Sequence, residues 1–178
     1  MAPDTAALNH PTIGSIKGTQ HSPNVEQYLG IKYATLTDRF ARGQPVESYP
    51  SSVDATSQGH AHDPSLSPFP LSSSLPNITS RPLPVANPQN CDLEHLLLQH
   101  ELPHPPYTFS DRDCLTLNVT APSAAVRSRA GGKPLPVLVY VHGGGFVTGS
   151  ASWPQWDLAN LVELSVAHGS PIVAVGVK

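Results

Sequence analysis

Three consecutive glycines directly follow an apolar stretch in the segment VLVYVHGGGFVTGS, residues 137–150. The stretch has no alternating polar face, which is typical of a strand covered on both faces in a parallel sheet. Glycine loses much backbone freedom on folding, so a run of three needs a structural reason. The segment therefore predicts a buried strand that ends in a loop whose backbone approaches another group closely.

Two nucleotide-binding loops also place glycines between a strand and a helix, and spacing excludes both. In the dinucleotide pattern GxGxxG counted from Gly143, Thr148 stands where the last glycine is required. In the phosphate-loop pattern, Gly144 and Gly149 have the right separation, but no lysine follows. The remaining functional interpretation is an oxyanion hole, in which backbone N–H groups stabilise the anion formed in acyl transfer. A tight turn with close packing is the structural alternative.

The residues after the glycines predict a helix and a second buried strand. Ser152 and Gln155 fit a capping box, Pro154 fits the first helical turn, and Gly169 fits the residue just past the helix end. The segment PIVAVGV, residues 171–177, is again apolar throughout. A strand, helix and strand in this order predict a right-handed parallel crossover. The expected apolar stripe of the helix comprises Leu158, Leu161, Val162 and Val166.

The first part of the chain predicts an antiparallel hairpin and then a long irregular segment. Strand signals cover Thr12 to Lys17 and Val25 to Ala34, with a turn at residues 21–24. From Val46 to Gln89 the chain is rich in serine and proline and has neither helical nor strand periodicity. Further on, CLTLNVTAP at 114–122 alternates apolar and polar residues, as a half-buried strand does.

Two histidine-containing segments resemble metal sites, but their sequence context argues against metal binding. HELPH at 100–104 matches the zinc-protease pattern HExxH, which requires both histidines on one unbroken helix. A short helix is predicted at 91–102, but Pro103 ends it before the second histidine. HAHD at 60–63 lies in the irregular segment and is interpreted as a solvated loop. No metal site is predicted.

Charge and the N-terminal sequence limit the partners. The net charge is -3, so no basic surface for nucleic acid is expected. The first residues, MAPDTAALNHPTIGS, have neither the basic start nor the apolar stretch of a signal peptide. No apolar run reaches the about 20 residues of a membrane-spanning helix. A cytoplasmic location is therefore expected.

Four motifs occur in the order and spacing of a known family. They are YLGIKYA at 28–34, RF at 39–40, SDRDCLTLNVTAP at 110–122 and PVLVYVHGGGFVTGS at 136–150. From about Ile13 to Val177 the chain resembles the N-terminal third of type B carboxylesterases, in the style of fungal members. The resemblance implies an α/β class chain with a partial α/β hydrolase fold. An N-terminal antiparallel hairpin would lead into a mixed, mostly parallel sheet that is incomplete at the C-terminus. Residues 1–178 would be one portion of a single domain, with about 46–90 irregular.

The resemblance also implies roles for individual residues. Gly144 and Gly145 would supply the oxyanion-hole N–H groups, His142 and Gly143 would shape the loop, and Phe146 would line the acyl side of the pocket. Cys114 occupies the family's DCL position, and an upstream cysteine pairs with it in secreted relatives. A disulfide between Cys91 and Cys114 and two free thiols therefore remain equal alternatives.

The catalytic serine of the family is not found in these residues. The family places it in a GxSxG motif downstream of the HGGG loop, followed by an acid and a histidine. None of the 13 glycines is followed two residues later by serine. We therefore expect a truncated, inactive fragment of a carboxylic ester hydrolase that requires no cofactor and acts on a small-molecule ester. A non-catalytic ligand- or partner-binding module of the same fold is the alternative. The strand at 137–141 would lose a neighbour and expose an apolar edge.

Overall fold

The computed structural model describes residues 5–38, 41–62, 102–103, 109–110, 112–128, 133–143 and 150–178. Within these residues, seven strands form the main sheet, and two short strand pairs and three helical segments accompany it. The strands of the main sheet are β1 (Thr5–His10), β2 (Gly14–Ser22), β3 (Val25–Lys32), β6 (Ser52–Asp54), β9 (Thr116–Pro122), β10 (Val137–Val141) and β11 (Val173–Val177). The other elements are β4 (Ala34–Thr35) with β5 (Gln44–Pro45), β7 (Ala61–His62) with β8 (Phe109–Ser110), α2 (Ser123–Arg127), the 3-10 turn η2 (Pro154–Trp156) and α3 (Ala159–Ala167).

The main sheet is mixed, as expected, and its strand order is β1-β2-β3-β9-β11-β10. Pairing is antiparallel from β1 to β11 along this order. The pairs β10–β11 and β2–β6 are parallel. The parallel part within the described residues is therefore smaller than the expected mostly parallel sheet, because β9 inserts antiparallel between the hairpin and β11.

The predicted hairpin is present as β2 and β3. β2 extends to Ser22, beyond the expected Lys17, so that only Pro23 and Asn24 remain in the turn. A register shift in β3 lies between Tyr28 and Ile31, where Gly30 has a φ of 69°. Because of this bulge, Tyr28 and Ile31 both contribute to the same core although they are three residues apart. Glycine suits this backbone conformation because it has no Cβ.

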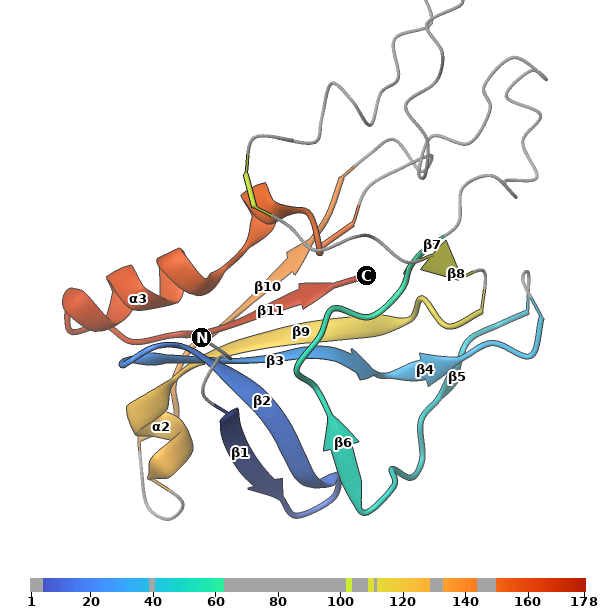
Figure 1. The fold of residues 1–178 in the computed structure, drawn as a ribbon, viewed down its shortest axis with the longest axis horizontal. Helices are drawn as coiled ribbons and strands as arrows, with labels where there is room; N and C mark the ends of the chain where they lie inside the picture. Colours follow the sequence, from blue (N-terminus) through green and yellow to red (C-terminus); the bar gives the residue numbers. More distant parts are fainter. Residues whose placement is uncertain are drawn as a thin grey trace, which may run out of the picture.

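The sheet packs a hydrophobic cluster on each face, and one helix accompanies each cluster (Figure 1). On the first face, Val126 of α2 packs against the cluster. On the second face, Ala159 and Val162 of α3 are fully buried. The first cluster consists of Ala6, Ile16, Tyr28, Ile31 and Ala55, and the second of Val25, Ala159, Val162 and Ala174. Burial on both faces fixes the register of the sheet, since a slip of one residue would exchange the two faces.

The predicted parallel crossover is confirmed, and its helix begins later than expected. β10 and β11 pair in parallel with α3 between them in sequence. Ser152 is not the N-cap of α3. The Ser152 hydroxyl donates to Gln58 Oε1 at 3.1 Å, and Pro154 lies in the separate 3-10 turn η2. α3 instead begins at Ala159, whose N–H donates to Asp157 Oδ1 at 2.9 Å. The Ser152 hydroxyl, which the sequence predicts to cap the helix, is hydrogen-bonded to the distant Gln58 side chain instead.

The end of α3 is as predicted. Gly169 has a φ of 66°, and its N–H donates to the Val166 carbonyl at 3.0 Å. The Ser170 N–H donates to the Ser165 carbonyl at 3.0 Å, which completes a Schellman motif. In the expected apolar stripe, Val162 is buried as predicted. The prediction for Leu161 is wrong, because its side chain is 39% exposed.

The predicted covered strand β10 is an edge strand in this structure. Val137, Val139 and Val141 are 60%, 59% and 71% exposed. β11 is its neighbour in the strand order, and among the described residues no strand lies on the other side. These three valines therefore expose an apolar face of β10, and the missing neighbouring strand stays a prediction. Apolar residues on both faces of β10 are typical of a strand that is covered on both sides.

The segment expected to be irregular contains short strands. Ser52–Asp54 forms β6, which pairs in parallel with β2, and Ala61–His62 forms β7, which pairs with β8. Val53 packs against the first hydrophobic cluster, and three residues are too short for a period to be recognised. The remainder of the segment from 63 to 89 and most of the predicted helix at 91–102 lie outside the described residues.

Candidate functional site: the ends of the glycine loop

The glycine loop begins at the carboxyl end of β10. His142 and Gly143 are described, and His142 Nδ1 lies 2.8 Å from the Gly143 carbonyl oxygen. A Cβ built on Gly143 would have no other atom within 4 Å. Gly144, Gly145 and Phe146 lie outside the described residues, so their expected roles remain predictions. Since Val141 pairs with Val177, the loop begins beside the carboxyl end of β11.

The residues that follow the loop are firmly packed. Ser150, Ala151, Ser152 and Trp153 are all between 3% and 8% exposed. The Ser152 N–H donates to Ser150 Oγ at 3.1 Å, and the Trp153 N–H donates to the Ser150 carbonyl at 3.2 Å. This turn lies against β11, because a Cβ built on Gly176 would be only 3.3 Å from the Ala151 Cβ. Both ends of the loop are thus attached to the parallel pair β10–β11.

An aromatic contact adds a second link between β10 and the residues after the loop. The rings of Tyr140 and Trp156 have centroids 5.3 Å apart and planes inclined by 37°. Aromatic pairs at this separation contribute about 0.5–1.5 kcal/mol beyond the area they bury. Partial burial raises the pKa of Tyr140 above its ordinary value, so the ring is neutral at physiological pH. The contact holds η2 over β10.

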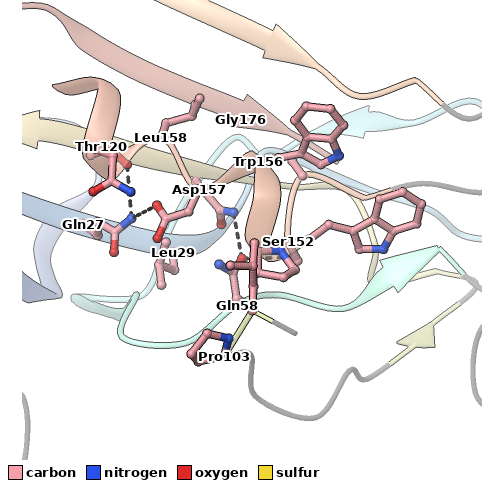
Figure 2. A pocket seen from close by; sticks show the side chains of 16 residues that line it. Gln27, Leu29, Gln58, Pro103, Thr120, Ser152, Trp156, Asp157, Leu158 and Gly176 are labelled. Atoms are coloured by element: carbon pink, nitrogen blue, oxygen red, sulfur yellow. Dashed lines mark hydrogen bonds between the residues drawn. The ribbon is translucent and has the colours of Figure 1, made fainter. Parts of the chain in front are cut away.

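A cavity of about 310 Å³ lies beside this turn (Figure 2). Its apolar wall includes Leu29, Trp153 and Trp156, and its polar wall is made by side chains of β3, β9 and the segment after the loop. The Gln27 amide donates to Asp157 Oδ1 at 2.8 Å and lies 3.5 Å from Thr120 Oγ1. Hydrogen bonds among the lining side chains therefore satisfy part of the polar wall.

A second polar group in the same wall centres on Gln58. Its Oε1 accepts hydrogen bonds from Ser152 Oγ at 3.1 Å and from Asn118 Nδ2 at 2.7 Å. Asn118 Oδ1 in turn accepts from the Gly30 N–H at 2.9 Å. The group joins the bulge in β3, the centre of β9 and the turn after the glycine loop. Sequence reasoning did not identify Gln58 or Asn118 as part of the site.

β9 differs from the expected half-buried strand, and this difference explains why Asn118 was missed. Thr116, Asn118 and Thr120 form its polar face, and they are only 3%, 7% and 2% exposed. Its apolar residues Leu117 and Val119 are half-buried on the other face. Alternation alone assigns a polar face to solvent. Here hydrogen bonds with distant residues satisfy Asn118 and Thr120 on that face, so that these two side chains can be covered instead.

A lysine occupies the position just after β11. The Lys178 ammonium donates to the Gly59 carbonyl at 2.7 Å, and the Tyr33 hydroxyl donates to the Lys178 carbonyl at 3.0 Å. Burial lowers the pKa of Lys178 from 10.5 to about 8. The amine is consequently neutral in part just above physiological pH.

Three further expectations concern metals, cysteines and membranes. Among the described residues, no group of three or more His, Cys, Asp or Glu side chains is arranged to hold a metal ion. Cys114 is buried, and Cys91 lies outside the described residues, so their disulfide stays a prediction. No helix in the described part of the chain has the length and apolar character needed to cross a membrane.

The model of the "Carboxylesterase family" matches residues 4–174, almost the whole chain. The chain belongs to the carboxylesterase family. It is 31% identical over 163 residues to the para-nitrobenzyl esterase of Bacillus subtilis (strain 168), covering 90% of this chain and 25% of that protein. It is 27% identical over 158 residues to the "Inactive carboxylesterase-like protein VdtD" of Byssochlamys spectabilis, covering 86% of this chain and 21% of that protein.

The fold of the carboxylesterase family is also found in the structural comparison. The structure titled "Thermophylic PNB esterase" superposes with a TM-score of 0.60 at 24% identity, over 97% of this chain and 27% of that chain. The likeness confirms a partial α/β hydrolase fold. Curated relatives that match most of this chain are much longer, and the chain spans 21% to 29% of their lengths.

Proposed function

We propose that residues 1–178 supply the oxyanion side of a carboxylic ester hydrolase site. The observation that carries the proposal is the HGGG sequence at the carboxyl end of β10 in a chain of the carboxylesterase family. In this proposal the backbone N–H groups of Gly144 and Gly145 donate to the oxygen that becomes negative when an ester carbonyl is attacked. His142 and Gly143 shape the loop, and Phe146 borders the acyl group.

The described geometry supports this role indirectly. Oxyanion donors must be in place before the reaction, because their advantage over water is that they need no reorganisation. The loop begins on β10 and ends in a buried turn packed on β11, so its two ends are attached to one rigid pair of strands. Loss of one such donor costs about 2.7–4 kcal/mol of transition-state stabilisation in serine hydrolases.

The remaining groups of the reaction lie outside these 178 residues in this proposal. No glycine is followed two residues later by serine, so the GxSxG nucleophile is absent from the sequence printed here. The acid and histidine that follow the nucleophile in the family are therefore assigned to no residue of this chain. We expect residues 1–178 alone to be inactive and to act only together with a nucleophile-bearing portion, on a small-molecule ester.

A second candidate is a non-catalytic module that binds a ligand or partner. It is favoured by the similarity to a relative that is itself named inactive. The two candidates differ in whether the loop contributes to turnover once a nucleophile is present.

A chimera tests the proposal directly. It joins residues 1–178 to the part of the Bacillus subtilis para-nitrobenzyl esterase that follows its matched segment. We expect turnover of p-nitrophenyl acetate by the chimera, and none by residues 1–178 alone. Gly145→Pro removes one backbone donor and should lower kcat by about 10²–10³-fold. Gly145→Ala retains the N–H group and is the matched control.

Two results would contradict the proposal. One is a Gly145→Pro chimera that melts like the Gly145→Ala chimera and has the same kcat. The other is turnover by residues 1–178 alone together with covalent labelling of one of its serines by a fluorophosphonate. A chimera that melts cooperatively without any turnover would favour the non-catalytic module.

A further inference from the structure

We propose that Gln58 is a positioning residue for the glycine loop. Its side-chain oxygen, held in place by Asn118, fixes Ser152 and thereby the point at which the loop rejoins the fold. The inference rests on the proposed function of the loop, and it deepens that function by naming a residue on which the donor geometry depends. Gln58 is 85 residues away from Gly143 in sequence and belongs to a segment that the family motifs do not include.

Gln58 connects two separate segments of the fold. Figure 2 shows Gln58 and Ser152 facing one another in the wall of the cavity. Gln58 Oε1 is the shared acceptor for the Ser152 hydroxyl at 3.1 Å and the Asn118 amide at 2.7 Å. An oxygen that accepts two bonds from separate segments restrains both segments at once. The Ser152 side chain is thereby tied to the same atom that holds Asn118.

Asn118 is held in place by the main sheet. It lies in the centre of β9, opposite Gly176 of β11, and is 7% exposed. Its Oδ1 accepts from the Gly30 N–H at 2.9 Å, within the bulge of β3. Both ends of its amide are thus used, and its neighbours on each side are sheet strands. Asn118 can therefore hold Gln58 in one orientation.

Ser152 connects Gln58 to the end of the glycine loop. Ser152 is 8% exposed, and its N–H donates to Ser150 Oγ at 3.1 Å. Ser150 is the first described residue after the loop and is 3% exposed. Removing the Gln58 oxygen leaves two donors in this wall without their acceptor, which favours movement of the turn. A displacement of about 1 Å at a reacting group can reduce a rate by about a hundredfold.

Three variants separate this role from a general effect on stability. Gln58→Leu removes the acceptor, whereas Gln58→Glu keeps an oxygen at the same distance along the side chain. Gln20→Leu is the matched control. Gln20 is also a half-buried glutamine with several hydrogen bonds, including one to Ser123 Oγ at 2.8 Å, but it lies on β2 beside the start of α2.

The first measurement is hydrogen exchange by mass spectrometry on residues 1–178, followed in peptides that span 143–153. We expect Gln58→Leu to accelerate exchange in these peptides by about tenfold, the effect of losing one to two hydrogen bonds. Gln58→Glu should exchange like the parent chain. Gln20→Leu should accelerate exchange in β2 and α2 and leave 143–153 unchanged.

The second measurement is kinetics in the chimera described above. We expect Gln58→Leu to lower kcat for p-nitrophenyl acetate by about tenfold to a hundredfold with KM nearly unchanged. Gln58→Glu should restore kcat, and Gln20→Leu should keep it even though its melting temperature falls.

The outcomes distinguish this inference from the function on which it rests. If Gln58→Leu exchanges no faster than Gln20→Leu in 143–153, the positioning role is wrong. If exchange accelerates as expected but kcat in a folded chimera is unchanged, Gln58 does hold the loop, and the proposed catalytic role of the loop fails. If Gln58→Glu loses as much kcat as Gln58→Leu, the shared acceptor is not the cause and the inference is overturned.

Discussion

Replacing Lys178 with methionine tests the electrostatics at the carboxyl end of β11. The ammonium group is half-buried and its described hydrogen bond is to a neutral carbonyl, that of Gly59. Burial lowers its pKa from 10.5 to about 8. An unfolded chain regains the ordinary pKa, so the folded and unfolded states bind different numbers of protons between these two values.

The sign and size of the effect follow from this difference. Between about pH 8 and pH 10 the unfolded chain binds more protons, so the free energy of unfolding rises with pH. A pKa lowered from 10.5 to about 8 corresponds to about 3 kcal/mol in total, which is lost again as the pH falls to 8. Tyr28 acts in the opposite direction above pH 10, because burial and its hydrogen bond to Glu26 raise its pKa. The contributions of Lys178 and Tyr28 together should therefore favour the folded chain most near pH 10.

Urea unfolding at several pH values between 7 and 10, followed by tryptophan fluorescence at low protein concentration, measures this effect. Lys178→Met should remove the slope between pH 8 and pH 10. At pH 7 it should stabilise the chain by about 1–2 kcal/mol, after allowing about 1 kcal/mol for the lost hydrogen bond to Gly59. Lys32→Met is the matched control, because Lys32 is 40% exposed and pairs with Asp113 at 2.6 Å.

The reasoning is refuted if the parent chain shows no rise in the free energy of unfolding between pH 8 and pH 10. It is also refuted if Lys178→Met retains the same slope as the parent. A slope lost equally in Lys32→Met would assign the effect to net charge instead of to the burial of one amine.

Two further predictions concern packing beside the loop. Val139→Lys places a charge at the centre of the exposed edge of β10, and sedimentation velocity should show fewer assemblies than for the parent. Leu164→Lys, at a 54% exposed residue of α3, is the control and should leave the amount of these assemblies unchanged. A parent chain that is monomeric and melts sharply would contradict the prediction that β10 causes association. Gly176→Val should cost about 2–3 kcal/mol in urea unfolding because Ala151 is too close. Gly143→Ala has open space and should cost far less, so equal losses would contradict the packing argument.

Local sequence patterns predicted the elements that depend on neighbouring residues alone. The apolar runs that became β10 and β11 and the glycine that ends α3 are recognisable because their signals are short-range. The family motifs then indicated a partial α/β hydrolase fold, which the comparisons confirm. Apolar residues on both faces of β10 indicate a covered strand, but they do not say whether the residues that cover it are present.

Long-range hydrogen bonds account for the features that were missed. Ser152 has the sequence of a helix cap and instead donates to Gln58, which lies 94 residues earlier. Asn118 has the sequence of a solvent-facing strand residue and instead lies under the turn that follows the loop. In both cases the partner is distant, so no periodicity or local spacing could have revealed it. The roles of Gly144 and Gly145 rest on the family motif alone.

The short pair β7–β8 has a consequence for engineering this chain. Ala61 pairs with Phe109 and His62 with Ser110, so the two strands that flank residues 63–108 lie side by side. When the ends of a segment are already held together, each doubling of its length costs only about 0.6 kcal/mol in closure entropy. A reporter domain with neighbouring termini could accordingly be inserted between β7 and β8 while the main sheet keeps its register, provided that Leu102 and Pro103, which line the cavity, are retained.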